Sequence, residues 1–104
     1  MIKIRLFCAA GFSTSMLVKK MNEAALADGI EVDIQACSQT KLMDNIKGID
    51  VALLGPQIAY TLAKSKQLCD EVNVPIDVIP MRDYGTLNGK AVLDFALNLI
   101  EEAK

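Results

Sequence analysis

Histidine is absent from this chain of 104 residues, and that absence excludes several kinds of active site. Without an imidazole, the chain can form no Cys–His pair, no Ser–His–Asp triad and no histidine-bound metal centre. Any reaction step that uses a phosphorylated histidine must therefore take that histidine from another protein.

Cysteine is scarce, with three residues that stand far apart in the sequence, Cys8, Cys37 and Cys69. An odd number of cysteines at wide spacing indicates neither a disulfide framework nor a zinc site. We expect no metal ion and no cofactor. We expect Cys37 and Cys69 to be buried thiols with a structural role only.

An excess of positive charge is also lacking, since 11 Lys and Arg residues face 13 Asp and Glu residues. Nucleic acid is therefore not an expected partner. No apolar run approaches the roughly 20 residues that a membrane span needs. Lys3 and Arg5 interrupt the first apolar run, which is unlike a signal peptide. We expect a cytoplasmic protein that does not itself insert into a membrane.

Apolar residues are plentiful, at 52% of the chain, and the length suits one compact domain over residues 1–104. Strand-like and helix-like segments alternate along it. Strands are expected at residues 2–7, 30–35, 50–54 and 76–79. Helices are expected at residues 16–28, 58–72 and from 88 or 89 onward, with a short, weak helix between Ser38 and Gly48. Gly29 is expected to end the first helix, and residues 81–86 to form a loop.

This alternation predicts an α/β fold, with a mostly parallel sheet covered by helices on both faces. In such folds the ligand site lies beyond the carboxyl ends of the strands. Three expected loops meet there, at residues 9–13, 55–57 and 80–84.

Cys8 stands at one of these positions, directly after the first predicted strand. A loop of small residues follows it, and hydroxyl side chains then open the next helix as candidate caps. Such a place suits an anion, because backbone N–H groups and a helix N-terminus face it. We interpret Cys8 as a nucleophile that carries a phosphoryl group; the alternative is a buried cysteine without a chemical role. The predicted phosphate loop comprises Ala9, Ala10, Gly11, Phe12, Ser13, Thr14 and Ser15.

Known loops of related function do not match this stretch. Met16 stands where a nucleotide P-loop has its second glycine, and Gly11 stands where a thioredoxin-like pair has its second cysteine. Thr14 stands where a tyrosine phosphatase has its arginine, six residues after the cysteine. That arginine binds the phosphate with two hydrogen bonds and stabilises the transferring group. A loop with neutral donors alone favours a relay of the phosphoryl group over its hydrolysis.

Two stretches, residues 6–18 and 51–60, resemble enzyme IIB of the lactose/cellobiose type. This enzyme belongs to the bacterial phosphoenolpyruvate-dependent sugar phosphotransferase system. The resemblance implies a three-layer α/β/α fold, similar to low-molecular-weight tyrosine phosphatases, with a four-stranded parallel sheet in the order 2-1-3-4. It also implies that Cys8 takes a phosphoryl group from a phosphohistidine of a IIA protein. The group then passes to a sugar on a membrane IIC permease, and a β-disaccharide of the cellobiose, chitobiose or lactose type is favoured.

The other loops supply further candidates for contact with phosphate or with a partner: Gln57, Met81, Asp83 and Tyr84. An apolar docking rim is expected from Met81 and Tyr84, together with Phe12 and Met16. For Met16 alone, core packing is the default expectation. We expect Asp83 to be a solvated loop residue and Tyr60 to pack within its helix.

Two other functions stay open from the sequence. One is a cysteine-dependent phosphatase or arsenate-reductase relative, which the threonine at position 14 disfavours. The other is a flavodoxin-like regulatory module without enzymatic activity, in which Cys8 would behave as an ordinary thiol.

Overall fold

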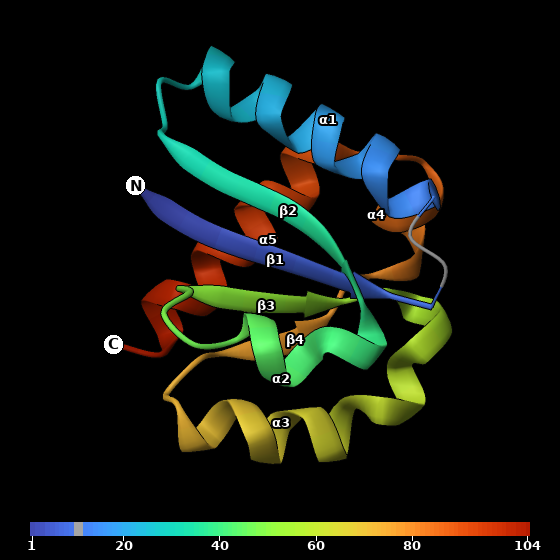
Figure 1. The fold of residues 1–104 in the computed structure, drawn as a ribbon. Coiled ribbons are helices and arrows are strands. Elements are labelled where there is room, and N and C mark those ends of the chain that lie inside the picture. Colours follow the sequence, from blue (N-terminus) through green and yellow to red (C-terminus); the bar gives the residue numbers. More distant parts are fainter. Residues whose placement is uncertain (10–11) are drawn as a thin grey trace.

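Four parallel strands form one sheet at the centre of the computed structural model (Figure 1), which describes residues 1–9 and 12–104, with only the backbone at Phe12 and Ser13. The strand order is β2-β1-β3-β4, as the family resemblance implies. The strands are β1 (Ile2–Cys8), β2 (Val32–Ser38), β3 (Val51–Leu54) and β4 (Ile76–Val78).

Helices cover both faces of the sheet, so the predicted three layers are confirmed (Figure 1). One face carries α1 and α5, and the other carries α2 and α3. The helices are α1 (Phe12–Ala27), η1 (Gln39–Lys41), α2 (Leu42–Asn45), η2 (Pro56–Thr61), α3 (Leu62–Glu71), α4 (Met81–Gly85) and α5 (Gly89–Glu102). Among the described residues, no helix combines the length and the apolar character that crossing a bilayer requires.

Strand β1 lies between β2 and β3, and its side chains alternate between two hydrophobic clusters. Ile4 and Leu6 belong to the cluster under α1 and α5, whereas Phe7 belongs to the cluster under α2 and α3. Strand β3 divides in the same way, and all four of its residues are buried. Burial on both faces explains why its sequence is apolar at every position.

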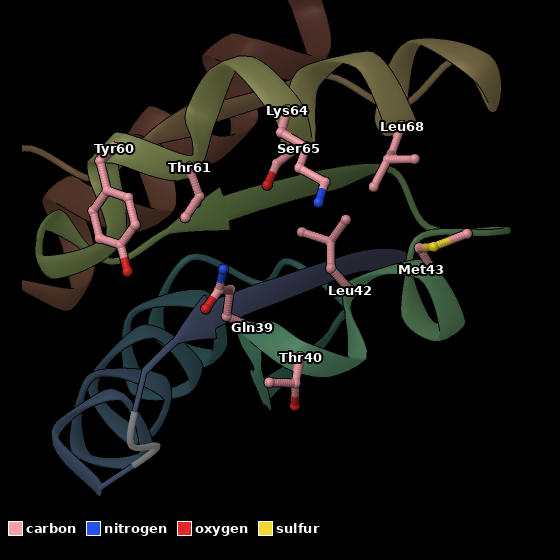
Figure 2. Close-up of a pocket in the computed structure, with 9 residues that line it drawn as sticks. All are labelled: Gln39, Thr40, Leu42, Met43, Tyr60, Thr61, Lys64, Ser65 and Leu68. Carbon is pink, nitrogen blue, oxygen red and sulfur yellow. The ribbon is translucent and has the colours of Figure 1, made fainter.

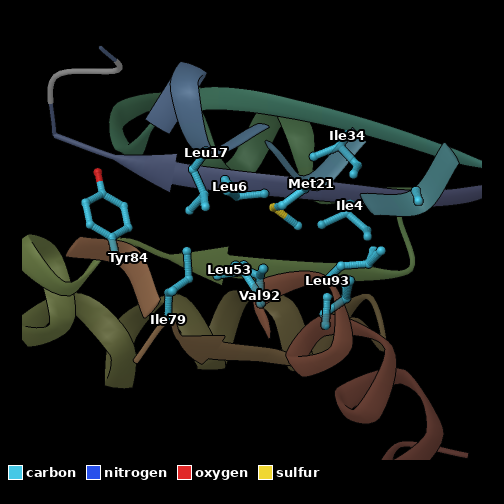
Figure 3. Close-up of a cluster of buried hydrophobic side chains, with 13 residues drawn as sticks. Ile4, Leu6, Leu17, Met21, Ile34, Leu53, Ile79, Tyr84, Val92 and Leu93 are labelled. Carbon is cyan, nitrogen blue, oxygen red and sulfur yellow. The ribbon is translucent and has the colours of Figure 1, made fainter. Parts of the chain in front are cut away.

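The cluster under α1 and α5 runs the length of the sheet (Figure 3). Leu17 and Met21 of α1 pack against β1, and Leu93 of α5 closes the cluster from the other helix. Tyr84 lies at the end of the cluster where the strands reach their carboxyl ends, and its hydroxyl points along that edge. The aromatic ring of Tyr84 therefore closes the hydrophobic core at the edge of the sheet that is expected to hold the site.

Several predicted boundaries are wrong. Helix α1 begins at Phe12 rather than at residue 16, and β2 spans Val32–Ser38 rather than residues 30–35. The helix expected over residues 58–72 is instead the segment η2, whose backbone leaves the helical region at Ile58, followed by α3. The expected loop 81–86 contains the short helix α4, which the burial of Tyr84 holds against the core. The left-handed stop at Gly29 is confirmed by its φ of 69°.

Arg5 departs from the apolar pattern of the buried part of β1, because its charged side chain is buried. Its guanidinium reaches the neighbouring strand and donates to the backbone oxygen of Asp33 at 2.8 Å and to its carboxylate at 3.1 Å. These hydrogen bonds satisfy the charge and hold the pKa of Asp33 below its usual value. Arg5 thus ties β1 to the edge strand β2.

Helices α1 and α5 approach each other closely at Gly89, the first residue of α5. A Cβ atom added there would lie 2.5 Å from the backbone carbonyl oxygen of Lys20 in α1. Contact with backbone cannot be relieved by rotating a side chain. Glycine therefore sets the distance between the two helices that cover this face of the sheet.

We predict that Gly89→Ala lowers the free energy of unfolding by about 1–3 kcal/mol, because the methyl group forces α5 away from α1. Urea unfolding followed by circular dichroism measures the change. Gly85→Ala is the matched control, because a Cβ atom at Gly85 meets nothing within 4 Å. Equal stability of the Gly89→Ala protein and the parent would contradict the close approach.

Candidate functional site

Cys8 is the last residue of β1 and lies at the carboxyl edge of the sheet, between the ends of its two neighbouring strands. It pairs with Ser38 of β2, and on the other side the N–H of Gly55 donates to the carbonyl oxygen of Phe7 at 2.9 Å. The residue is only 4% exposed, yet it belongs to neither hydrophobic cluster. The predicted place of Cys8, at the end of a central strand, is confirmed.

The predicted phosphate loop is only partly within the described residues. Ala9 is exposed, and Ser15 lies exposed in the first turns of α1. Ala10, Gly11 and the side chains of Phe12 and Ser13 lie outside the described residues. The cradle of backbone N–H groups before Cys8 therefore stays a prediction.

Thr14 lies within the first turn of α1, where its side chain is buried rather than capping the helix. Its hydroxyl oxygen lies 3.2 Å from the hydroxyl oxygen of Tyr84, in a buried hydrogen bond that either group can donate. The side chain at the position of the phosphatase arginine thus connects α1 to α4. No local sequence signal indicates this contact, because the partners stand 70 positions apart.

The expectation that Tyr84 forms part of a docking rim is wrong, because Tyr84 is buried. Met81 is accessible to a partner, since it is 73% exposed. Met16 is exposed, so its expected core packing is also wrong; it lies one position off the buried stripe that contains Leu17. The side chain of Asp83 is only 14% exposed, so it is not the solvated loop residue that we expected. Two exposed methionines therefore remain of the rim, with Phe12 outside the described side chains.

Gln57 lies beside Cys8 through the turn that follows β3. A Cβ atom added at Gly55 would lie 3.1 Å from the amide oxygen of Gln57 and 3.7 Å from the Cβ of Cys8. The absence of a side chain at Gly55 thus lets the two residues approach the same point. Tyr60, which we expected to pack within its helix, is instead 82% exposed.

The other two cysteines differ from Cys8 in their position in the fold. Cys69 is fully buried in α3, and burial raises the pKa of its thiol to about 11. Cys37 is half-buried on the face that carries α2 and α3, and burial raises its pKa as well. The structural role expected for Cys69 agrees with its burial, whereas Cys37 is less buried than expected. Within residues 1–9 and 12–104, no group of three His, Cys, Asp or Glu side chains could hold a metal ion.

Comparison with known protein families gives one match over most of the chain. The family described as "PTS system, Lactose/Cellobiose specific IIB subunit" matches residues 3–95. The match includes Cys8, Gln57 and both strands that flank β1. It therefore covers the whole candidate site.

Individual relatives agree with this match. The chain is 38% identical to the oligo-beta-mannoside-specific EIIB component of Bacillus subtilis (strain 168), over 96% of this chain and 97% of that protein. It is 42% identical to the galactose-specific EIIB component of Lactococcus lactis subsp. cremoris (strain MG1363), over 93% and 94%. The solution structure of a cellobiose-specific IIB component from Borrelia burgdorferi superposes with a TM-score of 0.82 at 35% identity, covering 99% and 94% of the two chains.

A more distant relative is a longer protein. The lactose-specific EIICB component of Lacticaseibacillus casei is 26% identical over 90% of this chain, which corresponds to 17% of that protein. Its name, EIICB, joins a IIC part and a IIB part. In that protein the region similar to this chain is thus one part of a larger phosphotransferase component.

We predict that the Thr14–Tyr84 hydrogen bond contributes about 0.5–1.5 kcal/mol of coupling to the free energy of unfolding. A double-mutant cycle of Thr14→Val, Tyr84→Phe and the combined variant, followed by urea unfolding, measures it. Tyr60→Phe removes the same hydroxyl from an exposed ring and serves as the control, with a change within about 0.5 kcal/mol. Strictly additive losses at the two positions would show that the hydroxyls do not interact.

We predict that alkylation of Cys69 by iodoacetamide at pH 8 is about a hundredfold slower in the folded protein than in urea. A pKa of about 11 leaves little thiolate at that pH, and full burial restricts the reagent further. Peptide mass spectrometry after timed quenching measures the rate at each cysteine. Equal rates for Cys69 in the folded and unfolded chains would contradict its burial.

Proposed function

The chain belongs to the lactose/cellobiose-specific IIB family of the sugar phosphotransferase system, and from this membership we propose that it carries a phosphoryl group on Cys8. Members of this family are sugar-specific phosphotransferase components. In the proposal, the donor is a phosphohistidine of a IIA protein. The acceptor is a sugar bound by a IIC permease, and the carrier works in the cytoplasm.

The position of Cys8 is the observation that carries this proposal. Cys8 ends a central strand at the carboxyl edge of a parallel sheet, where ligands of such folds bind. Cys69 is enclosed in α3, and Cys37 packs on the opposite side of the sheet from α1. Of the three thiols, only Cys8 lies at the end of a strand directly before the loop that leads into α1.

The proposed chemistry consists of two transfers. In the first, the Cys8 sulfur attacks phosphorus, an S–P bond forms, and the P–N bond to the donor imidazole breaks, with the nitrogen keeping the electron pair. In the second, a sugar hydroxyl oxygen attacks phosphorus, an O–P bond forms, and the P–S bond breaks to return the thiolate. The hydroxyl proton leaves to a base on the acceptor side or to water. Both steps depend on positioning, and neither uses a histidine of this chain.

A relay fits these residues better than a phosphatase. Thr14 replaces the arginine of phosphatases, and its side chain is buried against Tyr84 instead of facing an anion. This feature favours transfer to a docked acceptor over hydrolysis.

The sugar remains part of the proposal, as a β-disaccharide of the cellobiose, chitobiose or lactose type. The names of the relatives include an oligo-beta-mannoside, galactose and cellobiose. Relatives named for different sugars are similarly close to this chain. This pattern supports a common carrier chemistry, with the choice of sugar made by the permease.

We predict that Cys8→Ala abolishes phosphoryl uptake from a phosphorylated IIA protein, because the attacking sulfur is removed. Cys37→Ser and Cys69→Ala are matched controls that should retain uptake of one phosphate. Intact-protein mass spectrometry in a phosphoenolpyruvate-driven relay measures the uptake. A phosphate retained on the Cys8→Ala protein would refute the assignment.

The same protein also tests the phosphatase alternative. The isolated chain should show no steady turnover of an aryl phosphate, because it lacks the phosphatase arginine. Continuous release of phosphate that disappears in Cys8→Ala would instead favour a hydrolytic enzyme.

A further inference from the structure

A groove of about 500 Å³ lies on the face of the sheet that carries α2 and α3, between the η1–α2 segment and the η2–α3 segment (Figure 2). Its volume is within the range of small-molecule sites in proteins. Both segments follow the carboxyl ends of strands, so the groove starts near the edge that holds Cys8. Its lining includes neither Cys8 nor Gln57, which makes it distinct from the site described above.

Three polar side chains of the described lining point into this groove and are available to a ligand. Figure 2 shows the Gln39 amide, the Lys64 ammonium group and the Ser65 hydroxyl directed into the space between the two segments. Among the described residues, these three side chains form no hydrogen bond or ion pair. By contrast Lys66, also on α3, pairs with Asp70 at 3.4 Å.

The charge of the groove favours an anion. Lys64 is the charged residue of the described lining, which contains no aspartate or glutamate. Its positive charge is therefore not balanced locally. The neighbouring hydroxyl of Ser65 adds a hydrogen-bond donor of the kind that phosphate oxygens accept.

An aromatic ring completes the groove at one end. Tyr60 is 82% exposed, and Figure 2 shows its ring extending from the η2 segment at the end of the groove where Gln39 also lies. An exposed ring offers a flat apolar surface for the C–H face of a sugar. A nucleotide base would need a second apolar surface opposite the ring, and the side chain across from Tyr60 is the polar amide of Gln39.

We propose that this groove binds a phosphorylated sugar, with the phosphate at Lys64 and Ser65, hydroxyl groups at Gln39 and the sugar ring against Tyr60. Binding involves no step at Cys8. Only the further identification of this ligand with the product of the phosphoryl transfer rests on the proposed function. Binding of the sugar phosphate in this groove would then make the carrier respond to the accumulation of its own product.

The test is a titration of the ¹⁵N-labelled Cys8→Ala protein with glucose 6-phosphate, followed by NMR. This variant cannot form the phosphocysteine, so the result is independent of phosphoryl transfer. We expect saturable shifts at Gln39, Tyr60 and Lys64, with affinity at least about tenfold higher than for glucose or inorganic phosphate. Lys64→Gln and Tyr60→Ala should each weaken binding about tenfold, whereas Lys66→Gln, the matched control on α3, should leave it unchanged.

Three results would overturn the proposal. One is the absence of shifts in the groove up to about 10 mM glucose 6-phosphate. Another is equal binding of inorganic phosphate, which would show a general anion effect. The third is binding that Lys64→Gln and Tyr60→Ala leave unchanged. In each case the phosphoryl uptake of the parent protein remains a separate measurement, so the two proposals fail independently.

Discussion

The burial of β1 and β3 on both faces is the constraint on which the rest of this structure depends. Parallel strands that are covered by helices on both sides leave their carboxyl ends as the place where irregular backbone and polar groups can gather. Cys8 ends β1 at this edge, and the turn after β3 brings Gln57 beside it. The sheet thus determines where the residues of the candidate site lie.

A buried polar contact organises the same edge from one side. The hydroxyls of Thr14 and Tyr84 join the first turn of α1 to α4, and the Tyr84 ring closes the core beneath them. A polar pair in this environment is favourable only while both partners remain satisfied. The start of α1 is therefore held in place by packing and by a hydrogen bond.

Much of the fold could be predicted from local pattern. The alternating apolar segments indicated the parallel sheet, and Gly29 indicated the end of α1. The family resemblance indicated the strand order. Long-range packing could not be predicted: the burial of Tyr84, the close approach at Gly89 and the outward turn of Tyr60 depend on residues distant in sequence. The position of Cys8 was predictable because it follows directly from the end of its strand, whereas the groove between α2 and α3 exists only after both helices have packed.

The central claim is that the phosphoryl group resides on the sulfur of Cys8. Phosphorus NMR of the chain after incubation with a phosphoenolpyruvate-driven relay, and after removal of the donor proteins, tests it most directly. The account predicts a single phosphothiolate resonance that is lost on treatment with iodine, which cleaves S–P bonds. A phosphate ester resonance from a hydroxyl side chain, or no bound phosphorus at all, would contradict it.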